Sequence, residues 1–364
     1  MRHLRVPSVD TQHWLNLCKS NGWLFLGVSV TSLSDGMKGL PINDSAPKED
    51  DEIWLGHKHI QVEREISKAK QWTDLLDSNL YFQYEEYWPR SYEMIGDVLI
   101  VRFEEEVSKY KKEVAEAMLE RIKSARLICA DNGVTGEFRV RELEPIQSRN
   151  KDQSTLTKIK ENGQQITIDP AKAYFSSRLS TEREGNIIAA KQLSEKLQRP
   201  ITISDPYAGV GPALAGMFSQ PNLVQEINAG DLNPDAFELL KFNLNEFLSR
   251  SKNTPPQINI RCADARDWKN EEQFLQSTDL LLVNLPHDTI SHLSSLIPLM
   301  RRNQLTLIRG WAIISRNELQ STEQTIKMTI EKNGGSEIKL TCSEIKGFSS
   351  TKIFIRIESW QKFL

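Results

Sequence analysis

Acidic and glycine residues follow a short apolar segment in the second half of the chain. Residues 201–204 are rich in β-branched side chains, and the run Asp205-Pro-Tyr-Ala-Gly-Val-Gly-Pro comes directly after them. Residues 213–218, which include Ala213, Ala215 and Gly216, then have a pattern that predicts a helix. A glycine-rich turn between a strand and a helix lets a ligand approach backbone N–H groups closely. We interpret this turn as ligand-binding, and the alternative is an ordinary tight turn.

Three further polar positions follow strand-like segments. Asp231 closes a second segment, Asp264 follows residues 258–262, and Asn284 follows residues 279–283. Asp231 is placed to accept hydrogen bonds from ribose hydroxyls, or else it leads into a helix that begins near Pro234. Asp264 is placed to accept from an adenine amino group, or else it caps a helix. This order predicts an S-adenosylmethionine pocket, with the following cofactor-binding residues: Asp205, Tyr207, Gly209, Gly211, Asp231, Asp264 and Asn284.

The sequence Asn284-Leu-Pro286-His287 suits a substrate that presents N–H groups, such as the edge of a nucleobase. The preceding run of Leu and Val is typical of a buried parallel strand, whose carboxyl end faces ligands in open α/β folds. The alternative is a strand-ending turn, and we interpret His287 as a bystander. Upstream, Glu182 and Arg183 are placed to lie on a helix that covers the pocket, or simply on a capped helix start.

The pattern of the chain predicts several parts. Residues 1–48 form a compact unit with a strand at 3–6 and a helix at 10–21, and residues 49–90 form a linker and helical bridge. Residues 91–165 form a small α+β module with a strand at 94–103, a helix at 106–124 and strands at 126–130 and 136–144. Residues 166–364 alternate helices and strands as a doubly wound α/β sheet does.

Composition sets the broad class. The chain has 364 residues, a net charge of −3, 39% hydrophobic and 26% charged residues, as an ordinary soluble protein has. It shows neither a 20-residue apolar stretch nor a secretory signal, so we expect a cytoplasmic protein without a membrane span. Four widely spaced cysteines indicate neither a disulfide framework nor a metal site. A local excess of Lys and Arg between residues 139 and 199 suits an RNA partner, or is a solvated surface.

Taken together, the motifs resemble the archaeal and eukaryotic tRNA (guanine-N1)-methyltransferases that modify guanosine 37. The resemblance covers roughly residues 91–364 and, less closely, residues 1–48. It rests on the following runs: residues 136–144, 161–163, 174–183, 205–212, 231–234 and 284–286. Departures from the family pattern are Ser177, Ala213 and the pair Glu184-Gly185.

The resemblance implies an α/β class I (Rossmann-like) S-adenosylmethionine methyltransferase domain, a small α+β middle domain and a small N-terminal module that binds the tRNA elbow. It implies Glu182 as general base and Arg139 as catalytic arginine. The implied substrate-binding residues are the following: Arg141, Tyr174, Arg178, Arg183, Asn284 and Pro286.

The implied chemistry is consistent with these residue types. Guanine N1 carries a proton, which a carboxylate must remove as the methyl group arrives, and negative charge then develops on O6 beside a guanidinium. The implied partner is tRNA, contacted at the anticodon loop and the elbow by a monomer. Two alternatives stay open: a relative in wyosine synthesis that methylates a tricyclic guanosine or transfers an aminocarboxypropyl group, and a catalytically silent tRNA-binding protein.

Overall fold

The computed structural model describes residues 1–62, 71–251 and 253–364. They divide into two compact units, which are described separately. The first unit comprises residues 1–133 and 142–155, and the second comprises residues 134–141 and 156–364. Part of the helical bridge predicted within residues 49–90 falls on residues 63–70, outside the described residues, and a 3-10 turn follows at Trp72–Leu75.

The first unit begins with a four-stranded antiparallel sheet. Its strands, in spatial order, are β2 (Thr31–Ser32), β3 (Met37–Pro41), β1 (Arg2–Pro7) and β4 (His59–Gln61), and helix α1 (Thr11–Ser20) follows β1. The strand and helix predicted at the start of the chain are therefore present. Trp54 is fully buried in the core of this sheet, and Arg2 pairs with Gln61. The N-terminal sheet thus takes in residues beyond the predicted end at residue 48.

The rest of the first unit forms a second four-stranded sheet with helices packed beside it. Its strands are β5 (Glu93–Ile95), β6 (Val98–Val101), β7 (Leu127–Thr135) and β8 (Val140–Ser148), and its helices are α2 (Ser78–Gln83) and α3 (Lys111–Arg121). The single strand predicted at 94–103 is wrong, because Gly96 adopts a positive φ of 57° and turns the chain into a hairpin. The helix predicted at 106–124 begins as a 3-10 segment and becomes α-helical only at Lys111.

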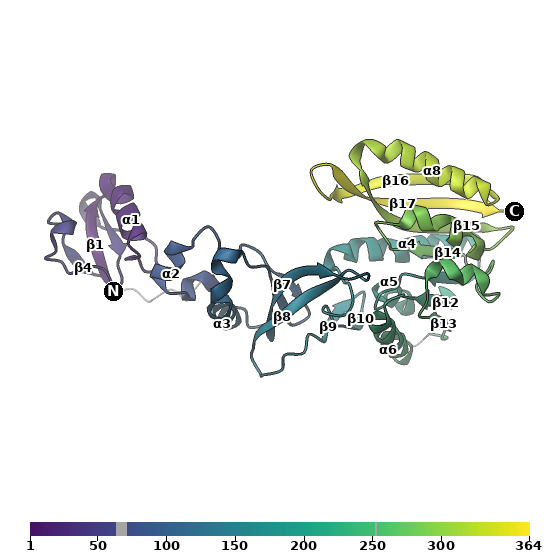
Figure 1. Ribbon diagram of the computed structural model, residues 1–364, viewed down its shortest axis with the longest axis horizontal. Helices are drawn as coiled ribbons and strands as arrows, with labels where there is room; N and C mark the ends of the chain where they lie inside the picture. The colour runs from purple at the N-terminus through teal and green to yellow at the C-terminus, as the bar shows by residue number, and fades with distance from the viewer. Residues whose placement is uncertain (63–70, 252) are drawn as a thin grey trace. The chain divides into compact units, whose positions relative to one another are not determined.

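A seven-stranded sheet organises the second unit (Figure 1). In spatial order its strands are β13 (Gln257–Arg261), β12 (Val224–Gly230), β11 (Ile201–Asp205), β14 (Leu280–Val283), β15 (Leu305–Ser315), β17 (Lys352–Phe363) and β16 (Gly335–Gly347). The first five are parallel and β17 is antiparallel. The strand order reverses between β11 and β14, where open α/β sheets bind their ligands.

Helices connect and cover these strands. They are α4 (Ser180–Leu197), α5 (Pro212–Ala215), α6 (Pro234–Arg250), α7 (Thr289–Leu296) and α8 (Leu319–Lys332), and the hairpin β9 (Thr157–Glu161) and β10 (Gln164–Ile168) precedes them. The helix predicted after the glycine turn is short, because α5 gives way to a 3-10 turn at Met217–Ser219. β10 packs against α6, and α8 lies along β16 (Figure 1).

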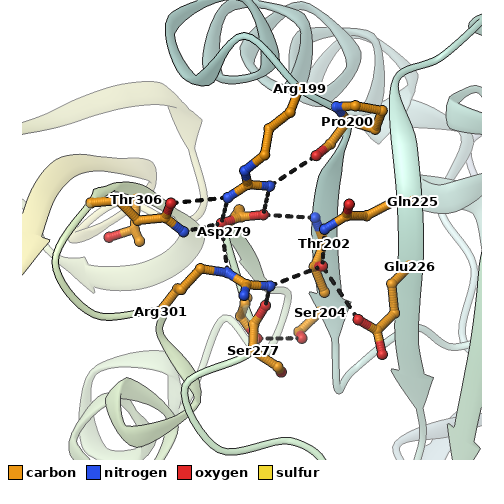
Figure 2. A network of polar contacts seen from close by, with 12 residues as sticks. Arg199, Pro200, Thr202, Ser204, Gln225, Glu226, Ser277, Asp279, Arg301 and Thr306 are labelled. Atoms are coloured by element: carbon orange, nitrogen blue, oxygen red, sulfur yellow. Dashed lines mark hydrogen bonds and ion pairs between the residues drawn. The ribbon is translucent and has the colours of Figure 1, made fainter.

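An ionic cluster closes the amino edge of this sheet, opposite the edge that Asn284 occupies. The Asp279 carboxylate is fully buried and accepts hydrogen bonds from Arg199 at 2.8 Å, Arg301 at 3.1 Å and the Thr202 backbone N–H at 2.9 Å (Figure 2). The carboxylate therefore ties the starts of β11 and β14 to the segment that leads into β15.

Within the described residues, no helix has the length and apolar character that a membrane span needs. The same residues contain no cluster of three or more His, Cys, Asp or Glu side chains that could hold a metal ion.

Candidate functional site

The turn after β11 requires glycine at two positions. Gly209 and Gly211 have φ values of 56° and 87°, which L side chains rarely adopt. A Cβ on Gly211 would also lie 2.9 Å from Cδ1 of Leu240. The Gly209 N–H donates to Asp231 at 2.8 Å, so this donor is engaged within the protein rather than bare.

Asp231 joins two strand ends. One carboxylate oxygen accepts from Gly209, and the other accepts from the Asn233 N–H at 2.9 Å. Burial raises the pKa of Asp231, and these two N–H groups oppose that shift. The N-cap of α6 is Asn233, whose side chain accepts from the Asp235 N–H. Asn233 therefore caps α6, and Asp231 lies at the strand end with each carboxylate oxygen bonded to a backbone N–H.

Asp264 does cap a helix. Its side chain accepts from the Arg266 N–H at 2.8 Å at the start of a 3-10 helix, and the Arg266 guanidinium pairs with the same carboxylate. Hydrogen bonding from Arg266 holds the pKa of Asp264 below its usual value. Nearby, the Tyr207 hydroxyl lies 2.7 Å from Nδ1 of His292, and burial raises the pKa of Tyr207.

A pocket opens beside the turn after β11. Three elements contribute its polar side chains: α4, the end of β11 and the end of β14. The lining residues are Leu179, Glu182, Arg183, Asn186, Asp205, Tyr207, Ala208, Pro212, Ala213, Leu282, Asn284 and Trp311. The structure thus brings together five residues of the predicted site: Glu182, Arg183, Asp205, Tyr207 and Asn284.

Glu182 lies in the first turn of α4 and is only 8% exposed. The indole N–H of Trp311 donates to its Oε2 at 3.0 Å, and Arg356 donates to its Oε1 at 3.4 Å. Trp311 and Arg356 are directly paired in the register of β15 and β17. These two donors fix the carboxylate at the pocket wall, and sequence reasoning missed both because they come from strands distant in the chain.

Arg309, another residue without a sequence signal, holds α4 against the sheet. It is 4% exposed, donates to the Gly185 carbonyl at 3.1 Å and pairs with Glu358 at 2.8 Å. Burial lowers the pKa of Arg309. A Cβ on Gly185 would approach the Arg309 guanidinium to 3.1 Å, which gives this departure from the family pattern a packing reason.

The remaining predicted residues near α4 differ in their surroundings. Arg183 is buried and pairs with Glu161 through two hydrogen bonds, and its guanidinium lies 5.1 Å from the Phe175 ring centroid. These contacts stabilise the fold around α4, and Arg183 also lines the pocket. Tyr174 and Arg178 are exposed. A role for these two in substrate binding stays a prediction.

Asn284 and Pro286 lie just beyond β14. Asn284 lines the pocket, and the Pro286 carbonyl accepts from the Ile313 N–H at 2.8 Å, which anchors this segment to β15. His287 is exposed beside Phe348, with the ring centroids 6.3 Å apart.

Arg139 and Arg141 lie where β7 turns into β8. The predicted strand at 136–144 is wrong in its first half, because Gly136 and Arg139 have positive φ values of 69° and 52° and form a turn. Arg139 is exposed, and its charge, after burial, lowers the pKa of His287. Neither arginine is among the residues that line the pocket.

The fold and the pocket define a Rossmann-like domain with a pocket at the switch point of its sheet, where open α/β folds bind their ligands. Residues 157–333 match the model of the TRM5/TYW2 methyltransferase domain, and residues 72–147 match the model of the TYW2 N-terminal domain. Residues 157–333 therefore form a methyltransferase domain of the TRM5/TYW2 family, as the sequence motifs predicted.

Curated relatives agree with this family. Over 206 residues the chain is 32% identical to the tRNA (guanine(37)-N(1))-methyltransferase Trm5b of Methanocaldococcus jannaschii, covering 56% of this chain and 57% of that protein. Over 223 residues it is 30% identical to Trm5b of Pyrococcus abyssi, covering 60% of each chain. The matched region thus spans about three fifths of the length of these relatives.

Solved structures confirm the predicted fold class. The crystal structure of Trm5b from Pyrococcus abyssi superposes with a TM-score of 0.65 at 22% identity and covers 100% of both chains. A structure of Pyrococcus horikoshii TYW2 in complex with MeSAdo has a TM-score of 0.61 at 16% identity, covering 77% of this chain and 94% of that one. At these identities the likeness concerns the fold, which is shared by both branches of the family.

Proposed function

We propose that the protein transfers a methyl group from S-adenosylmethionine to N1 of guanosine 37 in tRNA. The observation that carries the proposal is the buried Glu182 carboxylate, held by two donors in the same pocket as Asp205 and Asn284. The relatives at about 30% identity are tRNA (guanine(37)-N(1))-methyltransferases, which supports this substrate.

The pocket residues fit S-adenosylmethionine. Asp205 lines the pocket and is 2% exposed, and its Oδ1 has no hydrogen-bond partner among the described residues, so this acceptor is left for a ligand. We propose Asp205, Tyr207 and the glycine turn on one side, with Asp231 and Asp264 at the neighbouring strand ends, as the cofactor site. The cofactor, when bound, supplies a methyl group on a positively charged sulfur.

Glu182 acts in this proposal as the general base. Guanine N1 is a poor nucleophile while it carries its proton, and a positioned carboxylate that removes this proton accelerates transfer by about 10²–10⁴-fold. Trp311 donates to Oε2 and Arg356 to Oε1 of this carboxylate, and together they fix its orientation, which is the geometric requirement for such a base.

Arg139 stabilises the charge that develops on O6. A guanidinium forms strong charge-assisted hydrogen bonds to such an oxygen. The charge of Arg139 lowers the pKa of His287, which lies three residues after Asn284. This effect supports a position of Arg139 near the segment that binds the base. Asn284 and Pro286 hold the guanine edge, and Arg141, Tyr174 and Arg178 contact the surrounding nucleotides.

The test is methyl transfer from labelled S-adenosylmethionine to unmodified tRNA, followed by mass analysis of the nucleosides. We expect N1-methylguanosine with guanosine at position 37, and no product with adenosine there. Glu182→Gln and Arg139→Ala should each lower the rate by about 10²–10⁴-fold with nearly unchanged tRNA affinity. Glu184→Gln, on the exposed side of the same helix, is the matched control. A loss of tRNA affinity as large as the loss of rate would refute the catalytic assignment.

A second candidate is a reaction of wyosine synthesis on the same scaffold. It is favoured by one observation, the match of residues 72–147 to the TYW2 N-terminal domain. The same mass analysis separates the two reactions, because an aminocarboxypropyl group adds a larger mass than a methyl group. Tight tRNA binding without any transfer to either guanosine or its tricyclic derivative would instead favour a silent RNA-binding protein.

A further inference from the structure

Asn186 lies on α4 one turn after Glu182 and faces the same pocket. Its side chain is 0% exposed, and neither its Nδ2 nor its Oδ1 has a hydrogen-bond partner among the described residues. Deeply buried amides are normally paired, because an unsatisfied buried polar group is destabilising.

The same domain satisfies a comparable amide completely. Asn243 of α6 is also 0% exposed, and its side chain accepts from the Thr167 N–H at 2.8 Å and donates to the carbonyls of Thr167 and Val210. Other buried amides among the described residues, such as Asn162, Gln164 and Gln361, lack a partner at one atom, whereas Asn186 lacks one at both. Asn186 therefore resembles a group that awaits a ligand.

A second unpaired group faces the same pocket. Oδ1 of Asp205 is buried without a partner among the described residues. Together the two side chains offer two acceptor oxygens and one N–H₂ donor. A ligand that satisfies all three must present a donor group to the oxygens and an acceptor to the amide. An α-ammonium beside a carboxylate meets this requirement, whereas a carboxylate alone would be repelled by Asp205.

We propose that Asn186, together with Asp205, binds the amino-acid end of S-adenosylmethionine. The inference rests on the proposed function, since it assigns part of that cofactor to these residues. The Asn186 amide donates to the carboxylate, while its oxygen and Asp205 accept from the ammonium. This arrangement leaves the region around Glu182 and Asn284 for the guanine.

The test compares two ligands by isothermal titration calorimetry on the full chain. S-adenosylhomocysteine carries the amino-acid end, and 5′-methylthioadenosine lacks it. We expect Asn186→Leu to weaken S-adenosylhomocysteine binding by about 10–100-fold, since hydrogen bonds to charged groups are lost, and to leave 5′-methylthioadenosine binding unchanged. Gln192→Ala, which removes an exposed amide from the same helix, should change neither.

Thermal unfolding without ligand gives a second readout. Because Leu is apolar and similar in size to Asn, Asn186→Leu removes an unsatisfied amide and should keep or raise the melting temperature. If the Asn186→Leu protein does not fold, the binding of the same two ligands is compared with Asn186→Ala instead.

Three results would overturn the inference. Equal losses for both ligands would place Asn186 at the adenosine or in general pocket packing. A loss confined to the KM for tRNA would place it at the guanine, and a marked fall in melting temperature with unchanged ligand affinity would make it structural. If the wild-type chain binds S-adenosylhomocysteine as described yet transfers no methyl group to tRNA, the proposed function fails while the assignment of Asn186 stands.

Discussion

Asp205 shows how a single buried side chain links the pocket to stability. It is 2% exposed at the end of β11, and burial raises its pKa from 3.8 to about 7, against the opposing effect of the Tyr207 backbone N–H. The native protein therefore keeps this carboxyl protonated over a pH range in which the unfolded chain ionises it. Without a cationic ligand group beside it, ionised Asp205 destabilises the fold.

Because burial raises the pKa of Asp205, the direction in which stability changes with pH can be derived. Between about pH 4 and 7 the native state binds the proton and the unfolded state does not, so the contribution of Asp205 to the free energy of unfolding falls as pH rises. Asp205→Asn removes the ionisation, and we expect it to raise the ligand-free melting temperature more at pH 8 than at pH 5. Thermal unfolding at both values checks this. A difference between variant and wild type that does not change with pH would contradict it.

Among the elements of the fold, the strands that end at the pocket could be predicted, whereas the residues behind it could not. The segments ending near Asp205 and Asn284 are short runs rich in β-branched or leucine residues, and a third strand-like segment ends near Asp231. These patterns are local, so the sequence predicted β11, β12 and β14. Trp311 and Arg356 reach Glu182 only because β15 and β17 pair, which is a tertiary event without a local signature.

The errors in the strands predicted from the sequence also have a physical cause. A single glycine with positive φ divides the predicted strand at 94–103, and the turn at Arg139 replaces part of another. Asn186 had one weak signal, its position four residues after Glu182 on a helix, but its lack of a partner is visible only in the folded structure.

The amino edge of the sheet gives a prediction that separates stability from function. Asp279 is the carboxylate that Arg199, Arg301 and the Thr202 N–H share, at the edge opposite the pocket. Removing one partner of a buried ionic cluster typically costs about 3–5 kcal/mol, because the remaining charges lose their compensation. We expect Asp279→Ala to lower the melting temperature by several degrees, with the affinity of the folded protein for S-adenosylhomocysteine unchanged. Unaltered stability would show that the cluster does not hold the strands together.

On the scale of the whole molecule, the pocket and its supporting network belong to the second unit. All residues that line it fall within 134–141 and 156–364. The N-terminal sheet has a separate core built on residues such as Leu4, Trp14 and Trp54. Ligand binding by the pocket is therefore expected to be independent of that sheet, while binding of a large RNA need not be.

Truncation of the N-terminal sheet tests this division, and the position of the cut matters. A cut after residue 48 would remove β1 and leave its partner β4 unpaired, together with the buried Trp54. A protein that begins at Gln71 lacks the whole sheet. We expect it to bind S-adenosylhomocysteine as the full chain does, and to methylate an isolated anticodon stem-loop at a similar rate. On whole tRNA we expect its KM to rise, because the family resemblance implies that the N-terminal module contacts the tRNA elbow.

The two RNA substrates make the outcome decisive. Weaker activity on whole tRNA alone assigns the N-terminal sheet to recognition of a distant part of the tRNA. Equal KM values for the truncated and full-length proteins on whole tRNA would instead remove any role in binding from residues 1–62. A fall in cofactor affinity on truncation would contradict the independence of the pocket, because none of its lining residues comes from that part of the chain.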